Sequence, residues 1–180
     1  MGFDFFSFLK KSIFKSKNNI INDKNSTVII PMAPYGGLLF KKEIIKRIGL
    51  PNEQFYIYVD DFEFTYRITE AGYKIELVKN AFINDLEESW ITHKASSPII
   101  RIINNYNYKA FLNIRNGSYF SFFHLKKSNI IYFFNKYILL SHAFLYAVFH
   151  NKLGRFKYIL QLIKAGERGF FDNNSLKQFE

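Results

Sequence analysis

Residues 58–76 gather carboxylates at a point where the expected secondary structure changes; they read YVDDFEFTYRITEAGYKIE. Before the acid pair the chain is aromatic and β-branched, which is typical of a strand. From Asp61 onward Phe64 and Ile68 stand four residues apart, the spacing of one helix face, and Gly72 stands where such a helix would stop. The stretch therefore predicts a strand, a helix and a second strand, with the acids where the helix begins.

These acids have a structural interpretation and a chemical one. As the N-cap, Asp60 would form a capping box with Glu63, an acid taking the usual place of Ser or Thr. Glu63 and Arg67 also form an i to i+4 ion pair in the favourable order, worth about 0.3–0.5 kcal/mol. Asp61 has no structural partner in this scheme. An exposed, ionised acid at a helix start can accept a proton from a substrate hydroxyl, so both interpretations stay open.

The first half of the chain, residues 1–97, predicts a mixed α/β layout with a short mixed sheet. Leu39 to Ile48 carries apolar residues at helical spacing and is followed by Gly49, which suits a helix end. Runs of β-branched and aromatic residues predict strands at 27–30, 54–59 and 73–78.

The second half, residues 98–180, predicts a helical region that is basic and aromatic. Three segments are mostly apolar and nearly without glycine or proline, which favours helices over 97–115, 129–150 and 155–166. The length, 180 residues, favours a single compact unit built from the two halves.

The run 130–149 is about as long as a bilayer requires, roughly 20 residues. It has three interpretations: a transmembrane helix, which Lys136 disfavours, a buried helix at the back of the domain, or a helix lying on a membrane surface. In the third, cations would lie near lipid phosphates, namely Lys126, Lys127, Lys136, Lys152 and Arg155.

The net charge of +10 is unevenly distributed. Residues 51–100 carry nine acids and four Lys or Arg, and both flanks are basic. Basic flanks suit an anionic partner such as lipid or a phosphorylated substrate, whereas the acidic middle and the lack of a recognisable module disfavour nucleic acid. The chain has no cysteine, which excludes disulfides and thiolate metal sites and makes the cytosol or the inner face of a membrane the default compartment.

The order of motifs over residues 33–94 resembles a known family. A Gly-Gly loop precedes a helix and IGLP, then come an aromatic run, DDFEFTYR, AGY, a predicted strand and a histidine. This order is similar to the acceptor-side half of family 2 glycosyltransferases of the GT-A fold, particularly the rhamnosyl- and galactofuranosyltransferase-like branch. The resemblance implies an incomplete GT-A-like domain over 1–97, followed by the helical tail.

The resemblance also implies a role for each matching residue. Asp61 matches the catalytic base, which deprotonates an acceptor hydroxyl as a sugar leaves its nucleotide with inversion. His93 matches a histidine that helps to hold a divalent metal, Mn or Mg, on the donor diphosphate. The acceptor-binding positions are Asp60, Trp90, Gly36 and Gly37, and the supporting positions are Glu63 and Arg67.

The family's nucleotide-binding half ends in a D-x-D motif, and this chain contains no D-x-D. It therefore looks like a carboxyl-terminal part, with the nucleotide-binding half expected on a separate chain. The implied donor is a nucleotide sugar and the implied acceptor a glycan or lipid-linked glycan, in surface polysaccharide biosynthesis at the cytoplasmic face of the cell membrane. The alternative is a non-catalytic remnant that docks on a partner transferase or on a membrane.

Overall fold

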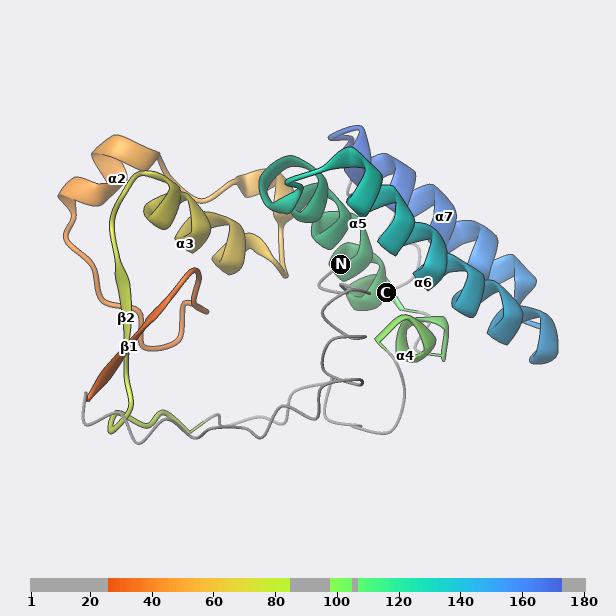
Figure 1. Ribbon diagram of the computed structural model, residues 1–180, viewed down its shortest axis with the longest axis horizontal. Helices are drawn as coiled ribbons and strands as arrows, with labels where there is room; N and C mark the ends of the chain where they lie inside the picture. The colour runs from red at the N-terminus through yellow and green to blue at the C-terminus, as the bar shows by residue number, and fades with distance from the viewer. Residues whose placement is uncertain (1–25, 85–97, 105–106, 173–180) are drawn as a thin grey trace. The chain divides into compact units, whose positions relative to one another are not determined.

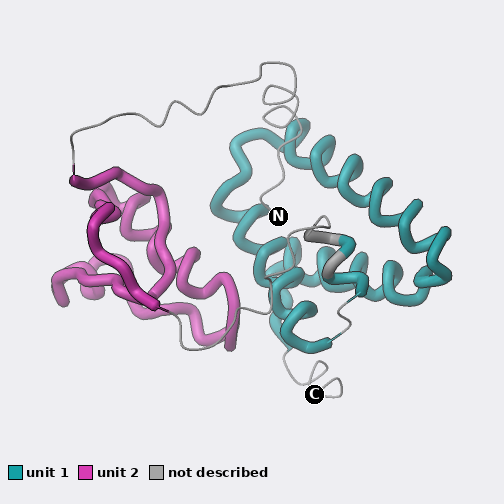
Figure 2. The backbone as a smooth tube through the Cα atoms, turned by 90° about the horizontal axis from the view of Figure 1, so that it is seen from below, with its two compact units in different colours: residues 1–17, 95–180 teal, residues 18–94 magenta. Residues whose placement is uncertain are grey.

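The computed structural model describes residues 26–84, 98–104 and 107–172 (Figure 1). The chain divides into two compact units, which we call unit 2, Asn18–Lys94, and unit 1, Met1–Lys17 with Ala95–Glu180 (Figure 2). The prediction of a single compact unit is therefore wrong. Unit 2 mixes a small sheet with helices and the described part of unit 1 is helical, as expected for an α/β first half and a helical second half.

The sheet of unit 2 has two strands among the described residues. β1 (Thr27–Ile30) and β2 (Ile75–Val78) pair antiparallel, with Thr27 opposite Val78 and Ile30 opposite Ile75. The predictions of strands at 27–30 and 73–78 are confirmed, the second in a shorter form. The sheet is antiparallel and not mixed.

The strand predicted at 54–59 is wrong. The chain there forms η1, a 3-10 helix over Glu53–Phe55, and Asn52 favours this turn because its side chain accepts a hydrogen bond from the Gln54 amide at 3.0 Å. Three residues then adopt left-handed backbone angles, Tyr56, Tyr58 and Val59, with φ of 62°, 66° and 68°. Such residues turn the chain and break extended pairing.

Two helices of unit 2 follow the sequence prediction more closely. α2 (Glu43–Ile48) begins later than expected but ends at Gly49, whose amide donates to the Ile45 carbonyl at 2.8 Å. α3 (Asp60–Glu70) ends just before Gly72, which has φ of 90°, a left-handed value that glycine adopts without strain. The predicted helix stops at Gly49 and Gly72 are confirmed.

The core of unit 2 is built around one face of α3. Phe64 and Ile68 are each 2% exposed and pack with Ile75 of β2, and partly buried neighbours surround them: Ile30, Ala33, Phe40, Ile44 and Ile48. The ring of Phe64 lies 5.7 Å, centroid to centroid, from that of Phe40. The four-residue spacing in the sequence thus identified the buried face correctly.

Two threonines on α3 hold the segment after β1 against the helix. The Thr65 side chain is fully buried, and its Oγ1 accepts a hydrogen bond from the Ala33 amide at 3.0 Å. The same hydroxyl lies 2.9 Å from the Ala33 carbonyl and 2.8 Å from the Asp61 carbonyl, either of which it can donate to. One turn later the Thr69 hydroxyl lies 2.9 Å from the Pro31 carbonyl. Residues 31–33 are therefore fixed to α3 by side-chain to backbone contacts.

The described part of unit 1 consists of α4 (Pro98–Asn104), α5 (Tyr108–Phe120), the π-helical turn η2 (Ser121–Leu125), α6 (Asn129–Phe149) and α7 (Leu153–Glu167). The segment 97–115 was predicted as one helical run and contains two helices. Asn107 begins the second, because its extended backbone and its side chain, which accepts from the Ala110 amide at 2.9 Å, form an N-cap.

Helices α5 and α7 pack closely. Any side chain added at Gly166 of α7 would collide with the Arg115 carbonyl and the Ser118 side chain of α5, so the contact requires glycine. The rings of Phe111 and Tyr158 meet edge to face, 4.9 Å between centroids. Arg115 is 2% exposed, and this burial lowers the pKa of its guanidinium to about 10.

We expect Thr65→Val to lower the free energy of unfolding by about 1–3 kcal/mol, because the partly buried Ala33 amide loses its acceptor while the packed volume stays the same. Thr65→Ser keeps the hydroxyl and serves as the control, with a smaller loss. Urea denaturation of both variants measures the difference. A larger loss for Thr65→Ser than for Thr65→Val would show that the methyl group contributes more than the hydroxyl.

Candidate functional site

The two adjacent acids lie at the first turn of α3, but their structural roles differ from the prediction. The N-cap is Val59, whose carbonyl accepts from the Glu63 amide at 2.8 Å, and no side chain caps the helix. The predicted capping box of Asp60 and Glu63 is therefore wrong. The left-handed Val59 shifts the helix start by one residue, so Asp60 is the first helical residue and Asp61 the second.

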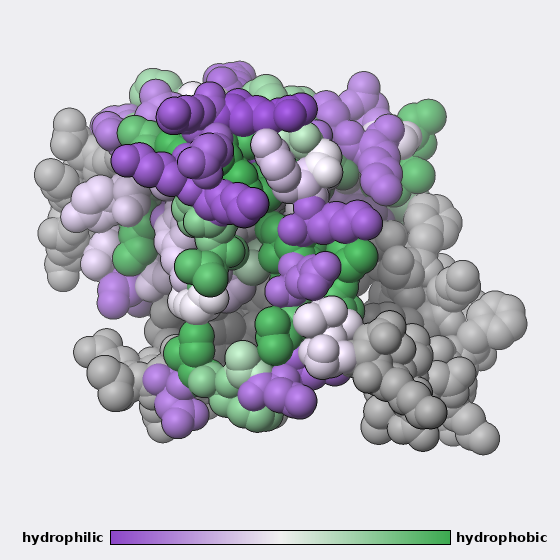
Figure 3. Space-filling model, turned by 90° about the vertical axis from the view of Figure 1, so that its left-hand side faces the viewer, coloured by the Kyte–Doolittle hydropathy of each residue, from purple (hydrophilic) through white to green (hydrophobic). Residues whose placement is uncertain are grey.

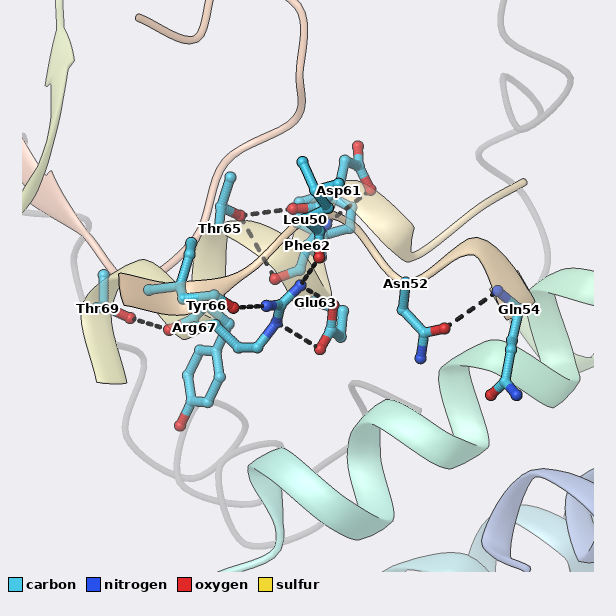
Figure 4. A network of polar contacts seen from close by, with 11 residues as sticks. Leu50, Asn52, Gln54, Asp61, Phe62, Glu63, Thr65, Tyr66, Arg67 and Thr69 are labelled. Atoms are coloured by element: carbon cyan, nitrogen blue, oxygen red, sulfur yellow. Dashed lines mark hydrogen bonds and ion pairs between the residues drawn. The ribbon is translucent and has the colours of Figure 1, made fainter. Parts of the chain in front are cut away.

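The carboxylate of Asp61, which was expected to have no structural partner, has one. Its Oδ1 accepts a hydrogen bond from the Phe62 amide at 2.8 Å, and in Figure 4 its second oxygen points away from the rest of the network. The side chain is partly buried, and this burial raises the pKa of the carboxyl, with a smaller contribution from the neighbouring charge of Asp60. Asp61 is therefore a positioned carboxylate that is more basic than an ordinary aspartate.

Tyr35 joins the acids from the loop that the threonines hold. Its ring lies 6.0 Å from that of Phe64, and the pKa of its hydroxyl is raised by burial first and then by the charges of Asp60, Asp61 and Glu63. The Tyr35 hydroxyl is therefore protonated at neutral pH and within the electrostatic influence of these acids. Sequence reasoning missed Tyr35, although it stands directly before the Gly-Gly pair, a position that could have indicated it.

Glu63 and Arg67 form the predicted ion pair, and it is more than a surface contact (Figure 4). Arg67 Nε lies 2.8 Å from Glu63 Oε1 and Nη2 lies 3.1 Å from Oε2, while Glu63 is 4% exposed. The guanidinium also donates to the carbonyls of Ile48 and Leu50, at the end of α2. Arg67 therefore joins α2 to α3, and the carboxylate of Glu63 holds the guanidinium in place through the ion pair.

Gly36 and Gly37 line a cleft of about 950 Å³ within unit 2. The cleft lies between the loop after β1, α2 and β2, and its wall is mainly apolar with four charged residues: Lys41, Glu43, Lys74 and Glu76. Figure 3 looks onto this side of the unit, where hydrophilic side chains gather over α2 and apolar ones are visible below it. Asp60 and Asp61, at the start of α3, are not among the residues that line this cleft.

Trp90 and His93 lie outside the described residues. Among residues 26–84, 98–104 and 107–172 no group of three or more His, Cys, Asp or Glu side chains is placed to hold a metal ion. Asp60 and Asp61 are adjacent carboxylates in the first turn of α3, whereas Glu63 is paired with Arg67. Two carboxylates alone do not make up a divalent-metal site. The predicted metal site therefore depends on His93.

Comparison of the chain with protein families, with curated proteins and with solved structures finds no match. The candidate site therefore consists of residues at the start of α3 and of the loop after β1. These are Asp60, Asp61 and Tyr35.

Val59 provides a test of the backbone at this site. A β-branched residue in the left-handed region is strained by about 1–2 kcal/mol, whereas asparagine tolerates that region. We expect Val59→Asn to raise the free energy of unfolding by about 1 kcal/mol. Val28→Asn, on the extended strand β1, is the matched control and should lower it. A destabilising Val59→Asn in denaturant titrations would contradict the strained geometry.

Asp61 should also make stability depend on pH in a defined direction. Because its pKa is raised on folding above the ordinary value of 3.8, the folded state binds more protons, and stability falls as pH rises from 3.8 through the raised pKa. Asp61→Asn removes this loss and should be more stable than the parent at neutral pH, with the difference vanishing below about pH 3.8. Thermal melts of both proteins across this range measure the effect; a variant that is less stable at neutral pH would mean that ionised Asp61 stabilises the fold.

Proposed function

We propose that this chain is the acceptor-side portion of an inverting, family 2-like glycosyltransferase of GT-A type, with Asp61 as its catalytic base. The observation that carries the proposal is the Asp61 carboxylate itself. One oxygen is fixed by the Phe62 amide, partial burial raises its pKa, and it lies at the start of a helix that the core holds in place. The motif order over 33–94 supports the same assignment.

In this proposal Asp61 takes the proton from an acceptor hydroxyl. As the hydroxyl oxygen forms its bond to the anomeric carbon, the bond from that carbon to the nucleoside diphosphate breaks, and the electron pair leaves with the diphosphate. A raised pKa makes the carboxylate a stronger base, and fixing one oxygen orients the other for transfer. Asp60 and the protonated Tyr35 hydroxyl would orient the acceptor's other hydroxyls.

The other residues of the proposed site would contact the substrates, hold the metal or support the fold. Gly36 and Gly37, with their cleft, would contact the substrates, and Trp90 would form a flat surface for a sugar. His93 would be a ligand of Mn or Mg, which supplies positive charge for the departing diphosphate. Glu63 and Arg67 act through the fold, because their charges are used to join α3 to α2. We place the reaction at the cytoplasmic face of the cell membrane.

A non-catalytic interaction module is the second candidate. Unit 2 leaves several large apolar side chains exposed, among them Leu39 at 95%, Phe82 at 86% and Leu50 at 68%. Such side chains favour a surface that another polypeptide covers, for example a partner transferase. This candidate predicts no response of the chain alone to nucleotides.

The test uses the full chain with Mn²⁺ and a panel of nucleoside diphosphates, followed by sugar transfer from the matching nucleotide sugars to membrane lipid extracts. We expect thermal stabilisation by one nucleotide and transfer that Asp61→Asn reduces about 10²–10⁴-fold, the usual contribution of a general base. Glu70→Gln, a change of an exposed acid on the same helix, is the control and should retain transfer.

The outcomes separate the two candidates. Stabilisation by a nucleotide with full transfer by Asp61→Asn would remove Asp61 from the role of base. No stabilisation by any nucleotide, with or without Mn²⁺, would favour the interaction module.

A further inference from the structure

Helix α6 exposes a mainly apolar face in unit 1, in which Ser141 is the polar residue. Five exposed residues lie on one side of the helix, because the intervals between them are close to one or two helical turns. They are Ile130, Phe134, Tyr137, Leu145 and Val148. We call them the apolar stripe; exposure within it reaches 83% at Ile130. By length and composition α6 is the one described helix able to cross a membrane, and 17% of its apolar window is buried. The interpretation of this segment as a buried core helix is therefore wrong.

The one charged residue of α6 faces the protein. Lys136 Nζ lies 2.6 and 2.7 Å from the two carboxylate oxygens of Glu167 on α7, and the Tyr132 hydroxyl donates to Glu167 Oε1 at 2.8 Å. Burial and the bond to Glu167 raise the pKa of the Tyr132 hydroxyl, which therefore stays a donor. Lys136 was predicted to lie near lipid phosphates, but this ion pair engages it within the fold. The apolar stripe consequently carries no charge.

The neighbouring surface is positively charged. Residues 121–171 contain eight Lys or Arg and a single acid, Glu167, which the ion pair engages. Exposed Lys157 and Lys164 lie seven residues apart on one side of α7, and exposed Arg168 directly follows the helix as its C-cap. Lys127 is exposed just before α6 begins. Two other predicted lipid contacts have protein partners instead: Lys152 bonds the Asn104 side chain, and Arg155 donates to the Ile103 and Asn104 carbonyls.

We propose that unit 1 docks on the surface of an anionic lipid bilayer, with α6 lying parallel to the membrane and the apolar stripe inserted between headgroups. An uncharged apolar face beside exposed cations is the chemistry that anionic membrane surfaces bind. A second copy of this chain would instead bring two strongly positive surfaces together.

The ion pair also argues for a helix that lies on the membrane over one that crosses it. Lys136 and Glu167 hold α6 against α7, together with the ring contact of Phe144 and Phe156 at 5.5 Å. If α6 crossed the bilayer, α7 with Lys157 and Lys164 would have to enter the hydrocarbon, which is costly for each charge. The proposal does not depend on the glycosyltransferase assignment, because the surface lies in the other unit.

Co-sedimentation of the full chain with vesicles tests the proposal. We expect binding to mixed phosphatidylcholine and phosphatidylglycerol vesicles that weakens with salt, and little binding to phosphatidylcholine alone. The double variant Ile130→Asp with Leu145→Asp should weaken binding about tenfold or more, because charges cannot insert beside the acyl chains. Lys157→Gln and Lys164→Gln should each weaken it about fivefold.

Phe170→Asp is the matched control, because Phe170 is an exposed apolar residue of the same unit outside α6, at 61% exposure, and should bind as the parent does. Circular dichroism checks that each variant keeps its helices. Absence of binding to either vesicle, unchanged binding of the double aspartate variant, or resistance of bound chain to alkaline extraction would each overturn a helix lying on the surface. So would a dimer in solution that the aspartates dissociate.

Discussion

The Thr65 hydroxyl is the contact on which the arrangement of unit 2 depends. It accepts from the Ala33 amide and lies within bonding distance of two carbonyls, so the segment after β1 cannot separate from α3 without leaving buried polar groups unsatisfied. Thr69 repeats the contact one turn later with the Pro31 carbonyl. Because this segment leads into Tyr35, the same contacts bring a tyrosine to the acids at the helix start.

The carboxylates at the start of α3 have different roles, because they are buried to different extents. Glu63 is nearly fully buried and is neutralised by Arg67, which is how a charge is accommodated in a core. Asp61 is partly buried, and this burial raises the pKa of its carboxyl even though the hydrogen bond from the Phe62 amide acts in the opposite direction. One short segment therefore contains a structural acid and an acid suited to accept a proton, which underlies the proposed role of Asp61.

In unit 1, too, an ion pair accommodates a charge that lies largely out of water. Lys136 on an otherwise apolar helix would be expensive alone, but Glu167 and Tyr132 satisfy it on the side that faces α7. This arrangement leaves the opposite side of α6 uncharged and mainly apolar, and the exposed charge of α7 positive. The helix is therefore asymmetric in a way that its composition does not reveal.

The amino-acid pattern alone was enough to predict the elements whose signal is local. The four-residue spacing of Phe64 and Ile68 predicted the buried face of α3, Gly49 and Gly72 predicted helix ends, and the order of charges predicted the Glu63 and Arg67 pair. The structure was needed to show that residues 54–59 turn with positive φ angles and that Val59 moves the helix start. It was also needed to show that the acids act on Tyr35 and that Lys136 pairs with Glu167. Periodicity and propensity act between neighbours in sequence, whereas the contacts of Thr65 with Ala33 and of Lys136 with Glu167 join residues 32 and 31 positions apart, whose partners the sequence does not name.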